Sequence, residues 1–237
     1  MKRGLNNTLF VTGTGTSVGK TYVCALLLEF LTNIGEQAGY QKWVATGVKA
    51  DLPDDLAYCL DAASISPMPE LVEQQVPYCF RYAASPHLAA EMEERAVEPE
   101  IIIKKYHTLA AQYEWLIVEG VGGIMVPLRR DLLLADLLAR LQPRTLVVAR
   151  SGLGTLNHTL LTLEALRTRK IPVLGVIFTD RKEREDERLI EDNVQIIKEM
   201  GEVRVFGRLR WQQDIIKARN AFIPVGHAIL EQLLHAP

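Results

Sequence analysis

The chain has 237 residues, 48% of them hydrophobic and 24% charged, and its 27 basic and 29 acidic residues give a net charge of −2. This composition excludes a disordered, collagen-like or coiled-coil protein. The near balance of charge provides no global attraction, so we expect no nucleic-acid partner and no membrane partner.

The predicted elements alternate between strands and helices. Apolar or β-branched runs, which fit strands covered on both faces, occur at Thr8–Thr12, Tyr40–Thr46, Trp115–Val118, Thr145–Ala149 and Val173–Phe178. Helices are expected at roughly Thr21–Ile34, Glu100–Tyr113, Leu132–Leu141, Leu156–Arg169 and Asp186–Met200. This alternation predicts the α/β class: a doubly wound, mainly parallel sheet flanked by helices.

Nothing in the sequence divides the chain, so residues 1–237 are expected to form a single domain. The proline-rich stretch Ser64–Pro86 is predicted to be an irregular excursion, and the charged run Asp180–Asp192 a solvated loop and helix start. The terminal segment Val225–Leu234 is apolar on one face but lacks the basic face of a membrane-surface helix. We therefore expect it to pack against the core.

The most informative segment is GTGTSVGKT, which lies between a predicted strand and a predicted helix. The backbone N–H groups of such a loop, together with the helix dipole, stabilise phosphate oxygens. Lys20 would reach the β- and γ-phosphates, and the Thr21 hydroxyl would coordinate Mg²⁺. A chance glycine-rich turn is the alternative, because the usual pattern is one residue shorter, but the position between strand and helix favours a nucleoside triphosphate. The residues of this site are Gly13, Thr14, Gly15, Thr16, Ser17, Val18, Gly19, Lys20 and Thr21.

Carboxylates follow two of the predicted strands. Glu119 ends a strand at the sheet edge where ligands bind, and an acid buried there is costly unless it meets a cation such as Mg²⁺. The alternative for Glu119 is a loop-capping role. Asp54 and Asp55 follow the second strand and could supply a further ligand, although Asp is also favoured at helix N-termini.

Two further segments could contact a substrate. Lys42 lies within a predicted strand, where it could face solvent or act as a second cation beside the phosphates. The segment Gly152–His158 opens a predicted helix and could hold a carboxylate at the helix N-terminus, or be a glycine turn with an Asn cap. His158 is expected to pack or cap locally rather than to act as a base.

Together these segments resemble the dethiobiotin synthetase family, which shares a P-loop NTPase superfamily with MinD-type ATPases. The resemblance rests on five stretches in the family's order: VTGTGTSVGKT (Val11–Thr21), KWVATG (Lys42–Gly47), SPHLAAE (Ser85–Glu91), VEGVGGIMVPL (Val118–Leu128) and Ala149–Phe178. It implies a cyclo-ligase that uses MgATP to convert diaminopelargonic acid and CO₂ or bicarbonate into dethiobiotin. A carbamate and a carbamic-phosphoric anhydride would be the intermediates.

The resemblance also implies roles for individual residues. The Mg²⁺ ligands would be Thr21, Asp54 and Glu119, with Asp54 chosen over Asp55. The catalytic residues would be Lys20, Lys42 and Thr16, and Glu119, Gly122 and Thr179 would join the nucleotide-binding loop. The substrate-binding residues would be Thr16, Lys42, Thr46, Gly154, Thr155, Leu156 and Asn157. The last four would come from the neighbouring subunit of a homodimer whose active sites lie at the interface.

The sequence departs from the family's pattern at four places. Trp43 replaces a proline and Ser17 an acidic residue. Thr179-Asp180 stand where an asparagine usually reads the purine, and Gly207–Arg210 replace a Gly-x-[IL]-Pro segment. The chemistry at the phosphates is little affected by these changes, whereas the preferred nucleobase is left open.

Two alternative functions are considered. One is a MinD- or ParA-like nucleotide switch, but Thr14–Thr16 lacks the additional lysine that such proteins typically carry early in the loop. The other is an ATP-dependent ligase of the superfamily that forms a different amide or urea.

The cysteines and the N-terminus predict the compartment. Cys24, Cys59 and Cys79 form no CxxC pair and no metal-ligand cluster, which favours a reducing compartment. The N-terminal apolar stretch is too short for a signal peptide, and no run approaches the ~18 apolar residues of a membrane span. We therefore expect a cytoplasmic protein.

Overall fold

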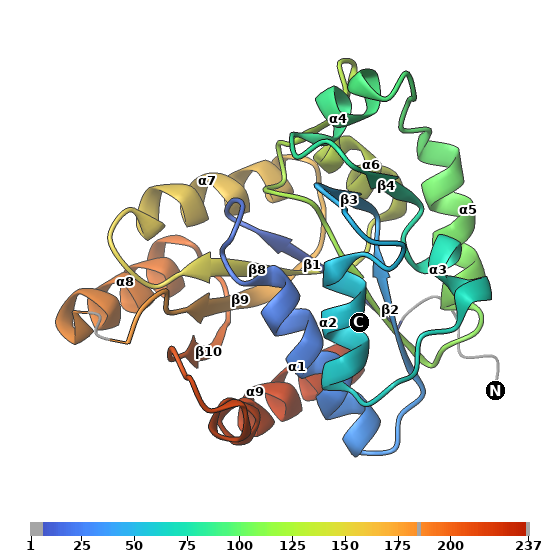
Figure 1. The fold of residues 1–237 in the computed structure, drawn as a ribbon. Helices are drawn as coiled ribbons and strands as arrows, with labels where there is room; N and C mark the ends of the chain where they lie inside the picture. The colour runs from blue at the N-terminus through green and yellow to red at the C-terminus, as the bar shows by residue number, and fades with distance from the viewer. Residues whose placement is uncertain (1–6, 184–185, 236–237) are drawn as a thin grey trace.

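The computed structural model describes residues 7–183 and 186–235. Its centre is a six-stranded sheet in the order β10-β9-β8-β1-β5-β2, and all neighbouring strands in it run parallel (Figure 1). The strands are β1 (Thr8–Gly13), β2 (Ala38–Lys42), β5 (Trp115–Glu119), β8 (Arg144–Arg150), β9 (Val173–Thr179) and β10 (Val205–Leu209). The predicted parallel α/β fold is confirmed.

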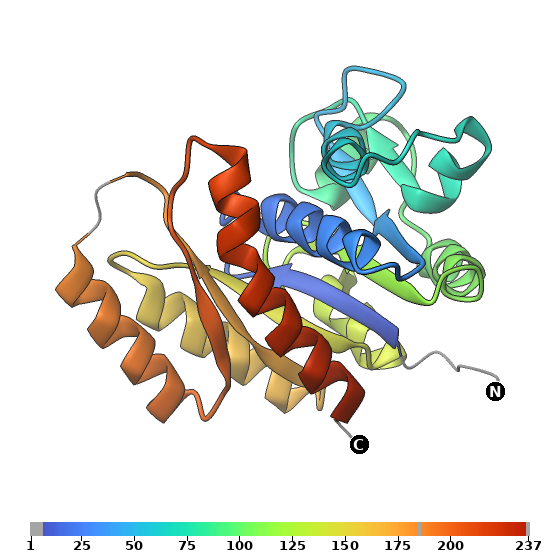
Figure 2. The same ribbon diagram turned by 90° about the horizontal axis from the view of Figure 1, so that it is seen from below.

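Helices cover both faces of this sheet (Figure 2). The helices α1 (Lys20–Asn33), α2 (Asp54–Ala62) and α9 (Ile215–His235) pack on one face. The other face is covered by α5 (Pro99–Ala110), α6 (Leu134–Leu141), α7 (Thr155–Thr168) and α8 (Glu187–Met200). Successive strand residues supply the two cores in turn, so that Leu9 and Val11 face α1 whereas Phe10 faces the opposite layer. The expected core packing of Val225–Leu234 is confirmed, since α9 buries Phe222, Val225, Ile229 and Leu233.

Within the described ranges, no helix combines the length and the apolar character needed to cross a membrane. Residues 1–6, on which the expectation of no signal peptide partly rests, lie outside those ranges.

The predicted strand Tyr40–Thr46 is interrupted at Trp43. β2 ends at Lys42 in the main sheet, while β3 (Val44–Thr46) pairs with β4 (Tyr78–Phe80) in a separate two-stranded sheet. The Trp43 side chain is fully buried, with its ring centroid 4.7 Å from that of Phe10 and 6.4 Å from that of Tyr106. Burial of this large ring therefore fixes the point at which the chain leaves the main sheet.

The stretch Ser64–Pro86, predicted to be irregular, contains regular structure. It holds α3 (Pro69–Gln75) and β4, and α4 (Pro86–Met92) begins at its end. Two of the four prolines that suggested an irregular segment, Pro69 and Pro86, stand at first helical positions, where a missing N–H leaves no hydrogen bond unmade. The predicted helix Leu132–Leu141 likewise begins with β7 (Leu132–Leu133), which pairs with β6 (Pro127–Arg129) before α6 starts.

Trp43→Ala is expected to lower the free energy of unfolding by about 3–5 kcal/mol, because it leaves a cavity against Phe10 and Tyr106. Urea unfolding would measure the loss. Trp211→Ala is the matched control: this side chain is 39% exposed, and the change should cost less than about 1 kcal/mol. Equal losses in the two variants would contradict a core role for Trp43.

Candidate active site

The loop 14–19 joins the C-terminal end of β1 to the N-terminus of α1. The Thr14 N–H donates to the Val148 carbonyl at 3.0 Å, which anchors the start of the loop on β8. At its end Gly19 has a φ of 94°, a left-handed conformation that glycine adopts without strain. A Cβ added at Gly13 would lie 2.6 Å from a methyl group of Val18, because the loop curls back over the end of the strand. The N-terminus of α1 thus forms an anion site framed by backbone N–H groups.

Lys20 lies buried within this loop. Its Nζ donates to the Gly15 carbonyl at 2.9 Å. Burial, with a further contribution from the nearby Lys42 ammonium, lowers the pKa of Lys20 to about 8. An anionic phosphate would supply the countercharge that favours the ammonium form. This environment fits the predicted contact between Lys20 and the phosphates.

Lys42 and Glu119 are register partners at the ends of the adjacent parallel strands β2 and β5. The Lys42 ammonium donates to Glu119 Oε1 and lies 2.9 Å from Asp55 Oδ2. Burial opposes the charge on Lys42, but the two carboxylates outweigh burial and raise the pKa of Lys42 above its usual range. Lys42 is therefore a buried cation rather than a solvent-facing strand residue.

Two further side chains, Thr21 and Tyr40, contact the buried carboxylate of Glu119. Thr21 Oγ1 lies 3.0 Å from Glu119 Oε1 and 2.9 Å from Asp55 Oδ1. The hydroxyl of Tyr40 donates to Glu119 Oε2 at 2.7 Å. Tyr40 was not among the predicted site residues, although its position two residues before Lys42 on a strand places both side chains on one face.

Asp55, rather than the expected Asp54, is the aspartate at this cluster. Both residues open α2, but Asp54 is exposed whereas Asp55 turns toward Lys42 and Thr21. Burial alone would raise the pKa of Asp55, but its pairing with Lys42 lowers it below the usual value. Consecutive helical residues point about 100° apart, so only one of the two can face the cluster. The structure thus brings Asp55, and not Asp54, to the cluster, while the identity of a metal ligand stays a prediction.

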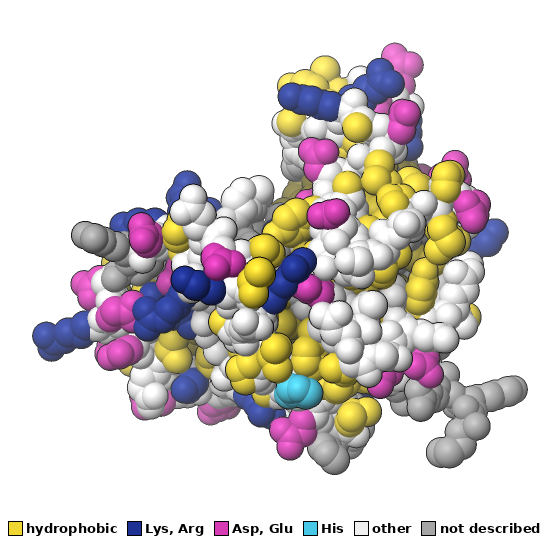
Figure 3. Space-filling model, turned by 60° about the horizontal axis from the view of Figure 1, so that its bottom comes forward, with side chains coloured by type: hydrophobic (Ala, Val, Ile, Leu, Met, Phe, Trp, Pro, Cys, Tyr) yellow, Lys and Arg dark blue, Asp and Glu magenta, His cyan; other side chains and the backbone are white. Residues whose placement is uncertain are grey.

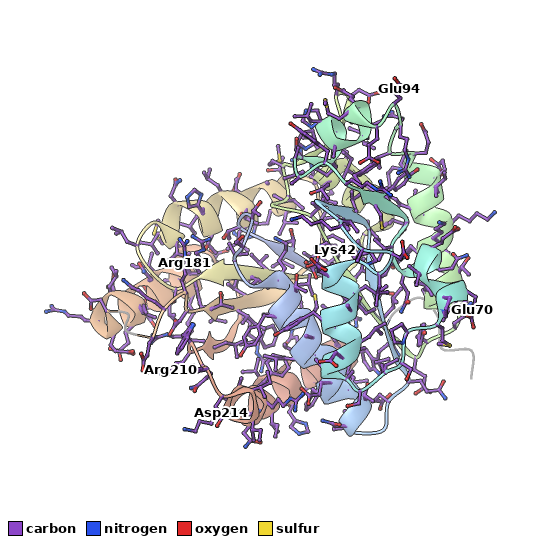
Figure 4. All side chains as sticks on the ribbon, viewed as in Figure 1. Lys42, Glu70, Glu94, Arg181, Arg210 and Asp214 are labelled. Atoms are coloured by element: carbon purple, nitrogen blue, oxygen red, sulfur yellow. The ribbon has the colours of Figure 1, made fainter. Side chains whose placement is uncertain are left out.

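Many of the predicted site residues line one of three clefts. The first, of about 450 Å³, is lined by Thr16, Ser17, Gly19, Lys20, Thr21, Tyr22, Lys42, Val44, Ala45, Thr46, Asp55, Glu119, Val121 and Gly122. The second, of about 390 Å³, shares Ser17, Gly19 and Tyr22 and extends to Thr179, Arg210 and Trp211. Figure 4 shows Lys42 near the middle of the molecule and Arg210 toward α8.

The segment 154–157 lines none of the three clefts. It lies at the N-terminus of α7, where Gly154 and Asn157 are exposed. The third cleft, of about 400 Å³, lies between this helix and the P-loop and is lined in part by Thr14, Gly15, Thr16 and His158.

Thr179 contacts the P-loop itself. Its buried hydroxyl donates to the Val18 carbonyl at 2.7 Å, and a Cβ added at Gly19 would lie 3.2 Å from its side chain. The hydroxyl is thus bonded to the loop, and the structure gives Thr179 a supporting position beneath the phosphate site.

Three residues that depart from the family's pattern near β9 and β10, Asp180, Arg208 and Arg210, belong to one ion-pair network. Asp180 accepts two hydrogen bonds of 2.7 Å from Arg208 and one of 2.5 Å from Ser151. Arg208 and Arg210 also both bond to Glu187 on α8. Basic and acidic side chains lie interspersed at this end of the molecule (Figure 3). The Asp180 carboxylate is thus already hydrogen-bonded to side chains of the protein itself.

The fold and the site together define a P-loop nucleotide-binding protein: a parallel sheet whose first strand leads into a phosphate-binding loop. A family model described as an AAA domain matches residues 7–219. Among solved structures, the ATP complex of Cyanothece McdA(D38A) has a TM-score of 0.59 at 11% identity and covers 96% of each chain. The MinC:MinD cell division complex of Aquifex aeolicus has a TM-score of 0.56 at 13% identity, over 96% of this chain and 94% of that one. Identities this low show the fold alone.

Curated relatives identify the family. The ATP-dependent dethiobiotin synthetase of Methanococcus vannielii is 36% identical over 206 residues, which are 87% of this chain and 94% of the relative. That of Endomicrobium trichonymphae is 37% identical over 219 residues, 91% and 97% of the two chains. The chain belongs to the ATP-dependent dethiobiotin synthetase family. It is accordingly a ligase, and its likeness to the MinD and McdA structures is a likeness of fold.

Asp55→Asn is expected to lower kcat/KM by about 100-fold, because it removes a charge that pairs with Lys42 and faces Thr21. Asp54→Asn changes the adjacent, exposed residue and should alter kcat/KM by less than about twofold. Steady-state assays of ATP-dependent phosphate release would compare the two variants. A larger loss in Asp54→Asn would restore the assignment made from sequence.

Proposed function

We propose that the chain converts 7,8-diaminopelargonic acid, CO₂ and MgATP into dethiobiotin, ADP and phosphate. Membership of the synthetase family supports this reaction. The observation that carries the proposal is the cluster of Lys42, Thr21, Asp55 and Glu119 beside the P-loop lysine, Lys20. It places cation-binding carboxylates and anion-binding ammonium groups together in one cleft of about 450 Å³.

The reaction has three steps. One amine of the diamine adds to CO₂ and loses a proton, which gives a carbamate. A carbamate oxygen then attacks the γ-phosphorus, the bond to the ADP oxygen breaks, and a carbamic-phosphoric anhydride forms. The second amine attacks the carbonyl carbon, phosphate leaves with the bonding electrons, and a proton is released as the cyclic urea closes. Phosphoryl transfer of this kind depends chiefly on positioning and charge neutralisation.

The residues of the first cleft would bind the phosphates, neutralise charge and hold the substrate. Lys20 and the N–H groups of the loop 14–19 would bind the phosphates of ATP. Lys42 would neutralise charge that develops on the transferring phosphoryl group and on the carbamate. Thr16 and Thr46, which line the same cleft, would hold the carbamate and the diamine.

The oxygen atoms around Lys42 fit Mg²⁺. The carboxylates of Asp55 and Glu119 surround a single cation, which in this structure is the Lys42 ammonium, and the Thr21 hydroxyl contacts both carboxylates. Oxygen donors of this kind suit Mg²⁺, whose remaining ligands would be phosphates and water. Bound there, Mg²⁺ would neutralise charge on the β- and γ-phosphates.

The second cleft would hold the nucleoside. It adjoins the phosphate loop through Ser17, Gly19 and Tyr22. Because Arg208 occupies the Asp180 carboxylate, we propose that Arg210 and Trp211, which line this cleft, contact the base.

The assay that tests the reaction combines the protein, Mg²⁺, bicarbonate, diaminopelargonic acid and ATP, GTP or CTP. Phosphate release and a product with the mass of dethiobiotin are expected only when diamine and bicarbonate are both present. Lys20→Gln and Lys42→Met should each reduce turnover by at least about 100-fold, because each removes a charge that stabilises phosphoryl transfer. Circular dichroism would control for folding.

Two outcomes would contradict the reaction. ATP hydrolysis that is indifferent to the diamine would favour a nucleotide switch. A product formed from a different carboxylic acid, with none from the diamine, would favour another ligase of the superfamily.

We further propose a homodimer in which the N-terminus of α7 reaches the partner's site. Leu153, Leu161 and Met125 are 92%, 60% and 49% exposed in this region, and apolar exposure of this extent is typical of interfaces. The N–H groups at the start of α7, in the segment 154–157, would bind the carboxylate of the diamine in the partner's site. This assignment follows the family resemblance, and the exposure of the segment supports it.

Subunit mixing tests this arrangement. Lys42→Met inactivates the P-loop half of a site, and Asn157→Asp places a repelling charge where the substrate carboxylate would bind. If the sites are shared, a mixed dimer holds one intact site, so equal mixing of the two inactive variants should restore about a quarter of wild-type activity. Lys42→Met mixed with Lys20→Gln is the control and should restore none. Absence of recovery in dimers shown to exchange subunits would contradict shared sites.

The domain organisation and the compartment are also proposals. The described helices pack on one main sheet, with one hydrophobic core on each of its faces, which supports a single domain over residues 1–237. Cys24, Cys59 and Cys79 are all free, which supports a reducing compartment and a cytoplasmic enzyme.

A further inference from the structure

The Lys42 ammonium lies among the oxygen atoms proposed to bind Mg²⁺. It bonds to Glu119 Oε1 and lies 2.9 Å from Asp55 Oδ2. Thr21 Oγ1 lies within 3.0 Å of both carboxylates. A divalent cation that uses these oxygens must therefore displace the ammonium or share them with it.

The surroundings of Lys42 favour the position of its ammonium between the Glu119 and Asp55 carboxylates. Its side chain is 7% exposed, and that of Glu119 is 1% exposed, so neither charge can rely on water. Tyr40 occupies Glu119 Oε2 and leaves Oε1 for Lys42 and Thr21. Without a cation, the buried carboxylate would carry a large desolvation penalty. Lys42 supplies that cation from within the chain.

We propose that Lys42 is an internal competitor for the metal site and is released onto the phosphates only when the metal arrives with its nucleotide. The proposal rests on the proposed function, because it uses the same metal ligands. If Mg²⁺ bound alone, it would displace the Lys42 ammonium, which would then have no anionic partner and would lie close to the Lys20 ammonium. Binding of Mg²⁺ alone is therefore unfavourable. The phosphates of a nucleoside triphosphate supply an anionic partner for Lys42, so metal and nucleotide bind together more favourably than either does alone.

This exchange would give the enzyme an order of events. While Lys42 pairs with Glu119 and Asp55, it is held away from the phosphates by its own ion pairs. Binding of the metal nucleotide would move its charge to the transferring phosphoryl group, where it is required. Binding of the metal nucleotide would thus release Lys42 to neutralise the charge on the phosphoryl group.

The experiment measures Mn²⁺ binding to the nucleotide-free protein by electron paramagnetic resonance. If Lys42 occupies the site for at least nine-tenths of the time, Lys42→Met should bind Mn²⁺ about tenfold more tightly than the wild type or better. Lys42→Arg keeps the charge and should bind as weakly as the wild type. The double variant Lys42→Met/Glu119→Gln should lose the gain, which would locate the added affinity at this site.

A second measurement uses the wild-type protein, in case Lys42→Met folds poorly. The lysine ammonium signals in heteronuclear NMR should include one for Lys42 that is absent in Lys42→Arg. This signal should keep its position with Mg²⁺ alone and shift with Mg²⁺ and AMPPNP. A shift of the same size with Mg²⁺ alone would overturn the proposal.

The outcomes separate this proposal from the proposed function. Equal Mn²⁺ affinity in folded wild type and Lys42→Met overturns the competition, while dethiobiotin formation by the wild type would still stand. If Mn²⁺ binds to none of the variants even with AMPPNP present, the metal-ligand assignment fails and the competition fails with it. The dethiobiotin assay on the wild type tests the reaction independently of both.

Discussion

Complete burial of the Glu119 carboxylate is the constraint on which this site depends. An ionised carboxylate with 0% exposure is tolerated only where a cation and hydrogen-bond donors surround it. Lys42 and Tyr40 supply them from β2, and Thr21 supplies a hydroxyl from α1. Asp55 joins through Lys42 and ties α2 to the same cluster. The charges that organise the chemistry therefore also hold together the elements that form the cleft.

The parallel sheet places this charged cluster next to the phosphate loop. The C-terminal ends of β1, β2 and β5 meet at one edge, where open α/β sheets bind their ligands. The loop after β1 provides anion-binding N–H groups, while Lys42 and Glu119 meet because they are register partners. Cation-binding and anion-binding groups consequently adjoin, as phosphoryl transfer requires. On the proposed exchange, nucleotide binding itself would transfer the Lys42 charge from one set of groups to the other.

Proteins with this fold need not share a function. McdA and MinD share the architecture at 11% and 13% identity, whereas the synthetases match at 36–37% over most of the chain. The fold provides the phosphate site, and side chains outside the P-loop decide what is done with the phosphate. In the second cleft, Asp180 bonds to Arg208, so the polar groups there differ from the asparagine of the family's pattern.

The sequence alone determined the alternation of strands and helices and the phosphate loop with Lys20 and Thr21. These features are local: apolar periodicity and a contiguous glycine-rich motif carry their own geometry. Tertiary structure decided that the predicted strand is interrupted at Trp43, that Asp55 rather than Asp54 faces the cluster, and that Tyr40 bonds to Glu119. Those outcomes depend on strand register, on the rotation of α2 about its axis and on the burial of one large ring. Each is set by packing between segments distant in the chain, which no local pattern of residues encodes.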